Sequence, residues 1–160
     1  MEKLKKWLKD NKITEIECIT PDQTGIARGK IMPTDKFIAE RGIRLPESVL
    51  LLTATGDYPD DELYYSLLDP TDIDMTLRPD EAAVYMVPWA AEPSAQIIHD
   101  CYDSMGNLME LSPRAVLKRV LSLYEAKGWQ PIVAPEVEFY LTKRCTDPDI
   151  PLEPPIGRSG

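Results

Sequence analysis

The sequence has one histidine, three cysteines and no long apolar run. Cys18, Cys101 and Cys145 are an odd number at wide spacings, which excludes both a disulfide framework and a zinc site built from paired C-x-x-C motifs. No stretch approaches the roughly 20 apolar residues that span a bilayer. The first residues also lack the apolar core of a secretory signal peptide. We therefore expect a cytoplasmic protein with no membrane-spanning segment.

Basic residues are outnumbered, 18 against 27 acidic ones, which gives a net charge of −9. This balance disfavours nucleic acid as a partner, because phosphate contacts need clustered lysine and arginine. The imbalance is concentrated in residues 57–81, which hold nine acidic residues and one basic residue. The 160 residues, 43% of them hydrophobic, suit one ordinary domain, or a small domain and the beginning of another.

The lone histidine offers little evidence of a site. His99 and Cys101 would share one face of a strand predicted over residues 96–102, but no third ligand accompanies them. We interpret His99 as a structural or exposed residue, and the cysteines as buried or incidental thiols in a reducing compartment.

The first hundred residues predict several short strands around short helices. Leu4, Trp7 and Leu8 have helical spacing, Thr34 and Gly42 bracket a second helix, and residues 57–81 are expected to be mostly loop. Residues 14–20 and 26–32 are predicted to form a hairpin with its turn at 21–25, and residues 49–53 an apolar strand or short element. Further strands are predicted at 75–77 and 82–87, around a turn at 78–81, and at 96–102. The fold class is therefore α+β.

A helix and a strand are predicted after residue 110. Ser112 and Pro113 start the helix, and Gly128 ends it. In the strand that follows, Ile132 to Leu141, Glu136 and Glu138 would share one face about 6.6 Å apart. Two carboxylates on one face suit a hard divalent cation such as Mg²⁺, so the pair is a candidate half of a metal site. The alternative interpretation is the solvated face of an amphipathic strand.

Several segments together resemble the glutamine synthetase family, in particular its branch that joins glutamate to polyamines such as putrescine. Their order and spacing carry the resemblance more than any one of them. The segments are Asp22–Lys30, Asp74–Asp80, Ser112–Arg114, Pro135–Leu141 and the ending Pro155–Gly160.

The resemblance implies a fold and a reaction. Residues 1–107 would form a β-grasp domain, 108–145 would open the catalytic domain with its first helix and strand, and 146–160 would be a mobile tail rich in proline and glycine. The family is an ATP-dependent carbon–nitrogen ligase that forms a γ-glutamyl amide through γ-glutamyl phosphate. It uses Mg²⁺ or Mn²⁺, with ATP as co-substrate. Matching positions make Glu136 a ligand of the metal on the ATP-phosphate side, and Glu138 a ligand of the metal nearer glutamate.

The resemblance also implies a homo-oligomer whose active site lies between subunits. The capping loop matches Gly56-Asp57, so Asp57 is a candidate for steering or deprotonating the incoming amine, ammonia or a polyamine. The glutamine-forming enzymes continue with Gly-Ser-Ser where this sequence has Tyr58 to Glu62. An acidic loop favours a cationic amine, although a solvated surface loop is the simpler interpretation. Arg28 and Lys30 would make a subunit contact or keep a strand edge soluble.

Residues 1–160 stop before the family's further metal ligands and its phosphate-binding arginines. We therefore expect this piece alone to lack ligase activity. The alternative function is a non-catalytic β-grasp module for subunit assembly, with Glu136 and Glu138 as surface acids.

Overall fold

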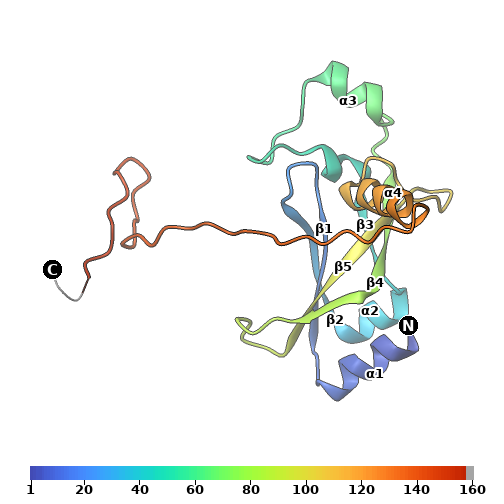
Figure 1. Cartoon of the computed structure of the whole chain (residues 1–160), viewed down its shortest axis with the longest axis horizontal. Coiled ribbons are helices and arrows are strands. Elements are labelled where there is room, and N and C mark those ends of the chain that lie inside the picture. The colour runs from blue at the N-terminus through green and yellow to red at the C-terminus, as the bar shows by residue number, and fades with distance from the viewer. Residues whose placement is uncertain (158–160) are drawn as a thin grey trace. The chain divides into compact units, whose positions relative to one another are not determined.

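The computed structural model of this chain describes residues 1–157. The last three residues of the predicted tail and of the Pro155–Gly160 motif lie outside the described residues. The chain divides into two compact units, Met1–Trp129 and Gln130–Gly160. Almost all regular secondary structure belongs to the first unit, which is shown in Figure 1 from blue to orange.

The first unit is built on one five-stranded sheet of order β2-β1-β5-β4-β3. The central strands β1 and β5 are parallel, and each other pair is antiparallel. The strands are β1 (Glu15–Pro21), β2 (Ala27–Pro33), β3 (Ile43–Pro46), β4 (Asp74–Met86) and β5 (Ser94–Tyr102), and the helices are α1 (Glu2–Asp10), α2 (Thr34–Glu40), α3 (Asp61–Leu67) and α4 (Pro113–Glu125), with a 3₁₀ turn, η1, at Glu47–Leu51. The structure thus confirms a mixed α+β fold.

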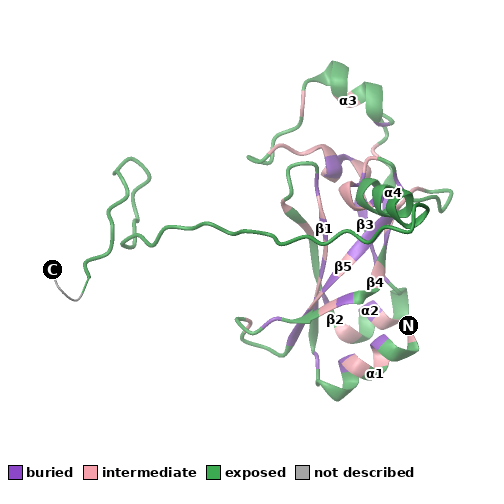
Figure 2. Cartoon of the chain, in the orientation of Figure 1, coloured by how far each residue is buried: buried purple, intermediate pink, exposed green. Residues whose placement is uncertain are grey.

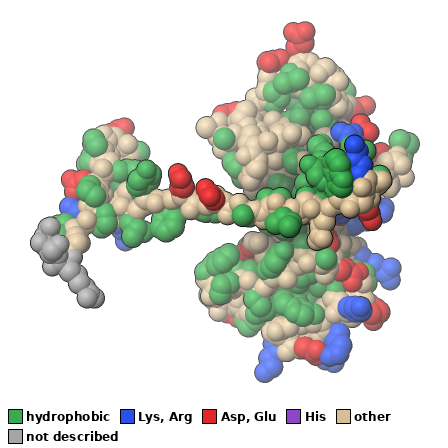
Figure 3. All heavy atoms as spheres, in the orientation of Figure 1, with side chains coloured by type: hydrophobic (Ala, Val, Ile, Leu, Met, Phe, Trp, Pro, Cys, Tyr) green, Lys and Arg blue, Asp and Glu red, His purple; other side chains and the backbone are tan. Residues whose placement is uncertain are grey.

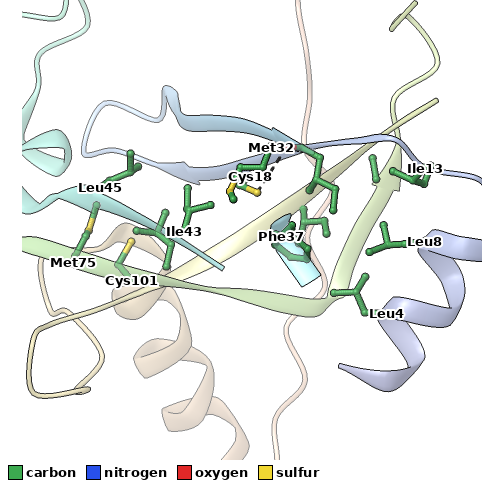
Figure 4. Packing of buried hydrophobic residues seen from close by; sticks show 14 of the residues in the cluster. Leu4, Leu8, Ile13, Cys18, Met32, Phe37, Ile43, Leu45, Met75 and Cys101 are labelled. Carbon is green, nitrogen blue, oxygen red and sulfur yellow. Dashed lines mark hydrogen bonds between the residues drawn. The ribbon is translucent and has the colours of Figure 1, made fainter. Parts of the chain in front are cut away.

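One face of the sheet packs against α1 and α2. Alternate residues of the two central strands point into this core, as the period of two requires. Leu8 from α1 and Phe37 from α2 are fully buried against them, and Phe37 meets the ring of His99 edge-on at 5.9 Å. Figures 2 and 4 show the buried positions and their packing. The inward residues of the central strands are Ile16, Cys18 and Thr20 in β1, and Ala95, Ile97, His99 and Cys101 in β5.

The opposite face carries α4, held by charge. Asp100 of β5 points away from the core and is 8% exposed. It accepts from Arg114 Nε at 3.0 Å and also pairs with Lys118. Arg114 Nη2 reaches Asp80 of β4 at 2.5 Å. Burial alone would raise the pKa of Asp100, but the bonds from Lys118 and Arg114 outweigh it and lower that pKa.

The apolar residues of α4 recur at helical spacing, which is the pattern that predicts this helix, but their side chains are largely uncovered; they are Val116, Leu117, Val120, Leu121 and Tyr124. Ala115 is buried, whereas Leu117 is 55% and Leu123 is 60% exposed. Figure 3 shows hydrophobic side chains gathered over this helix. Ser112 is the N-cap residue as predicted, but its side chain makes no capping bond.

Several element predictions are wrong in detail. β4 is one strand with a register irregularity between Pro79 and Val84, in place of two strands around a turn, because β5 pairs with it on both sides of the irregularity. The element expected at 49–53 is no strand but a short element, since residues 49–51 belong to η1, and α3 interrupts the predicted loop. Thr34 lies inside α2, because its hydroxyl donates to Ile13 C=O at 2.9 Å rather than capping the helix.

The strand predicted over residues 132–141 is wrong: these residues form no strand in the structure. Their apolar side chains are exposed, including Ile132 at 95% and Phe139 at 76%. A strand needs the hydrogen bonds of a neighbour, and no described strand pairs with this segment. Among residues 1–157, no helix has the length and apolar character that a bilayer crossing requires.

Candidate functional site

Asp57 lies at the end of a tight exposed turn formed by residues 53–57. Thr53 N–H donates to Asp57 C=O at 2.9 Å, and Asp57 N–H donates to the Thr53 hydroxyl at 3.1 Å. Gly56 has a φ of +87°, a conformation that glycine adopts without steric cost. The Asp57 carboxylate accepts from the Thr55 hydroxyl at 2.7 Å, which leaves its other oxygen open to solvent or to a ligand.

A buried ion pair holds this turn against the hairpin. Asp22 is fully buried, and one of its carboxylate oxygens accepts from Arg28 Nε at 2.7 Å. Arg28 Nη2 then donates to Thr53 C=O at 3.2 Å, so the guanidinium bridges the hairpin and the Asp57 turn. The sequence predicted Arg28 as a subunit contact or a soluble strand edge, and the structure instead gives it this internal role.

The other oxygen of Asp22 organises the hairpin turn. It accepts from the N–H groups of Thr24 and Ile26 at 2.9 and 3.0 Å and from the Thr24 hydroxyl at 2.8 Å. Burial would raise the pKa of Asp22, but Arg28 and these donors more than compensate, so the pKa lies below its ordinary value. The motif Asp22-Gln23-Thr24-Gly25 signalled a turn, and its buried charge is the part that the sequence reasoning missed.

The acidic segment after Asp57 begins with a capped helix. Asp60 accepts from Leu63 N–H at 3.0 Å and starts α3, which in Figure 1 lies at the other end of the sheet from α1. Three tyrosines cluster here: Tyr58 and Tyr64 meet edge-on at 5.6 Å, and Tyr64 and Tyr65 at 5.1 Å. Acidic residues alternate with these tyrosines along residues 57–65, and both kinds of side chain attract organic cations.

Glu136 and Glu138 lie in the second unit, in the exposed stretch without secondary structure. Their carboxylates are hard oxygen donors, so their chemistry fits Mg²⁺ or Mn²⁺. Two carboxylates are too few for an octahedral ion, and among residues 1–157 no group of three potential ligands from His, Cys, Asp and Glu is found. Their role as metal ligands therefore stays a prediction, as does the role of Asp57.

His99 is structural, as the sequence analysis allowed. Its ring is fully buried, and Nδ1 lies 2.9 Å from Ile97 C=O. Burial disfavours the charged imidazolium and lowers the pKa of His99 to about 4. Burial likewise raises the pKa of Cys18 to about 12, so this thiol is not reactive at neutral pH.

Known proteins resemble this chain over the segments that carry the candidate site residues. The catalytic-domain model of glutamine synthetase matches residues 110–156, the range that contains α4, Glu136 and Glu138. The γ-glutamylputrescine synthetase PuuA of Escherichia coli is 29% identical over 159 residues, 96% of this chain and 33% of that protein. Both matches make this chain similar to members of the glutamine synthetase family.

Other relatives support the same assignment. A glutamate–isopropylamine ligase from a Pseudomonas species is 27% identical over 141 residues, 87% of this chain and 30% of that protein. The glutamine synthetase of Methanococcus voltae is 34% identical over 101 residues, 61% of this chain and 22% of that protein. The chain thus spans about a third of the length of these relatives, or less.

A solved structure shares the fold. The chain superposes on a structure described as a GmaS/ADP complex with a TM-score of 0.62, covering 79% of this chain and 26% of that one at 22% identity. This likeness shows the fold of the chain alone.

Proposed function

We propose that this chain is the N-terminal part of an ATP-dependent glutamate–amine ligase. The observation that carries the proposal is the position of Glu136 and Glu138 within residues 110–156, which match the glutamine synthetase catalytic domain. Relatives named for putrescine and isopropylamine align over most of the chain. We further infer a β-grasp domain over residues 1–107, supported by the parallel pairing of β1 with β5 and by helices on one face, then the start of the catalytic domain at 108–145 and a tail at 146–160.

The proposed reaction proceeds in two steps. The γ-carboxylate oxygen of glutamate attacks the γ-phosphorus of ATP, which releases ADP and leaves γ-glutamyl phosphate. The amine nitrogen then attacks the acyl carbon, the C–O bond to phosphate breaks, and inorganic phosphate leaves. Divalent cations, when bound, neutralise the negative charge on the phosphoryl oxygens. Glu136 and Glu138 would each supply part of a cation's ligand shell.

Asp57 has the proposed role of holding the amine. A protonated amine must lose a proton before its nitrogen can attack, and a nearby carboxylate both attracts the cation and accepts that proton. Arg28 would be a positioning residue, because its hydrogen bond to Thr53 C=O fixes the turn that carries Asp57. The acidic and aromatic surroundings, from Tyr58 to Tyr65, favour a polyamine over ammonia. The active site is proposed to lie between subunits of a cytoplasmic homo-oligomer.

The test is ATP-dependent γ-glutamyl amide formation by the full-length protein, with putrescine and ammonia as alternative amines. We expect Glu136→Ala and Glu138→Ala each to abolish turnover, and Asp57→Asn to lower kcat/KM for the amine by roughly 10²-fold. Glu125→Gln, on the exposed part of α4, is the matched control and should leave activity unchanged. Residues 1–160 alone should give no product.

An assembly module without catalysis is the second candidate. It is favoured by the first unit having a complete sheet and core of its own. In that case both glutamate variants keep full activity in the full-length protein, while substitutions in the β1–β2 hairpin change the oligomer size.

A further inference from the structure

A basic groove in the first unit is lined by none of the candidate site residues. It encloses about 620 Å³ between β2, α2 and β3, and neither Asp57, Glu136 nor Glu138 lines it. Four of its lining residues are cations, and one is an acid. The charged lining residues are Lys30, Lys36, Arg41, Arg44 and Glu40.

The groove forms where the two open edges of the sheet approach one another. β2 and β3 are the edge strands. Lys30 on β2 nevertheless donates from Nζ to Arg44 C=O on β3 at 2.9 Å. Because Thr34 N–H donates to Thr14 C=O, the alternate residues Gly29 and Ile31 direct their backbone groups to the open edge. Of these two residues Ile31 lines the groove, so one main-chain N–H at the open edge lies beside the cationic side chains.

Carboxylates offset the positive charge of the groove only in part, because Glu40 pairs with Lys36 and Glu2 interacts electrostatically with Arg41. Glu40 approaches Lys36 only to 3.8 Å, and both side chains are more than half exposed. Among residues 1–157, neither Arg41 nor Arg44 forms an ion pair. The negative end of α2 offsets part of the Arg41 charge. Lys30 and Arg44 are then the groove cations whose charge no carboxylate or helix end offsets, although the net charge of the chain is −9.

The backbone at the end of α2 is fixed in an unusual way. Arg41 has a φ of +60°, a left-handed conformation in which glycine is the usual residue. Gly42 follows, and a Cβ on it would lie 2.2 Å from Leu77 C=O, so only glycine fits against β4. The close approach of Gly42 to β4 fixes the backbone here. Arg41 is therefore held at the rim of the groove, although its left-handed conformation has an energetic cost.

We propose that this groove binds a small-molecule anion with two or more negative charges, carried by phosphate or carboxylate groups. Arginine side chains pair with either group through two parallel N–H bonds, and lysine adds a point charge. The side chain of Ile31, which lines the groove and is 65% exposed, provides an apolar surface for the rest of the ligand. A groove of this volume matches ligands of metabolite size. The proposal is independent of the ligase function.

The experiment titrates residues 1–160 with inorganic pyrophosphate and, separately, with succinate, and follows backbone amide resonances by NMR. We expect saturable shifts confined to residues 29–44, and the tighter of the two probes identifies phosphate or carboxylate as the preferred group. Arg41→Gln and Arg44→Gln should each weaken binding roughly tenfold. Both side chains are exposed, so the fold should persist, as circular dichroism would verify.

Arg119→Gln is the matched control, because it removes one exposed arginine from α4. Unchanged affinity in this variant supports the proposal. Equal weakening by all three variants, or shifts spread over the lysines of α1, would identify general counter-ion attraction and overturn it. Absence of saturable shifts with both probes would overturn it as well, whatever the outcome of the ligase assay.

Discussion

Strand β5 and the stretch from Ile132 to Leu141 both contain residues that favour strands, but only β5 forms one. Both are rich in β-branched and aromatic residues with polar residues between them. In β5, neighbours on both sides bury Ile97 completely, whereas Ile132 is 95% exposed. Residue preference therefore predicts an extended backbone in both, but a strand forms only where this chain supplies a partner edge.

The largest expected effect tests this comparison with the two phenylalanines of the chain, Phe37 of α2, which packs against His99 of β5, and Phe139 of the exposed stretch. Phe37→Ala should lower the free energy of unfolding of the first unit by about 3–5 kcal/mol, because it opens a cavity in a fully buried site. Urea denaturation followed by circular dichroism measures this loss. Phe139→Ala, at a side chain 76% exposed, is the matched control and should change stability by less than about 0.5 kcal/mol.

Equal effects of the two substitutions would contradict the comparison. A large loss from Phe139→Ala, in particular, would mean that residues 130–157 have a core of their own.

His99 sharpens the comparison through pH. Its folded-state pKa of about 4 lies below the ordinary value of 6.5. Below pH 6.5 His99 is protonated in the unfolded chain but stays neutral in the folded core. The free energy of unfolding therefore falls as pH drops from about 6.5 to about 4. A shift of this size corresponds to about 3 kcal/mol at the lower end of the window. Denaturation midpoints at intervals between pH 7 and pH 4 measure it.

His99→Gln, which cannot titrate, should lose the stability slope that His99 contributes in this window. An unchanged slope in that variant would assign the pH dependence to other groups. The amide resonances of residues 130–157 should respond little to the same core transition.

Arg28 gives the next effect. Arg28→Met leaves Asp22 charged, buried and without its cation, which should cost about 2 kcal/mol after allowance for the partial exposure of the guanidinium. The turn at residues 53–57 should loosen, since it loses the bond to Thr53 C=O. Hydrogen exchange at Thr53 and Asp57 measures this loosening. Arg119→Gln is again the control, and protection unchanged in Arg28→Met would remove the proposed link.

Much of the fold could be predicted from local pattern. The hairpin follows from alternation around Pro21–Gly25, and α4 from Ser112-Pro113 and its apolar stripe. The continuous β4 could not be predicted, because its pairing with β3 and β5 along most of its length decides it. The strand predicted at 132–141 also shows this dependence on pairing, because no described strand pairs with it and it does not form.

The candidate site was only partly readable from the sequence. Asp57, Glu136 and Glu138 stand out through resemblance and spacing, and the structure leaves their roles as predictions. The supporting pair Asp22–Arg28 was hidden, because a turn motif and an exposed-looking arginine do not reveal that they meet. The six-residue separation across the hairpin, an acid in the turn and a base on the returning strand, is the signal that would have found it.

The smallest expected effect concerns metal binding by residues 130–157. Because Glu136 and Glu138 supply only two carboxylates and lie on no strand, Mn²⁺ should bind this pair weakly in residues 1–160, with Kd on the order of 1 mM. Paramagnetic broadening of amide resonances should nevertheless be strongest at Glu136–Glu138, because two adjacent carboxylates hold the ion longer than one. Glu136→Gln should reduce it there, whereas Glu153→Gln, next to Lys143, should not. Broadening concentrated instead at the acidic residues 57–74 would place the preferred cation site of this piece in the first unit, on the segment that carries Asp57.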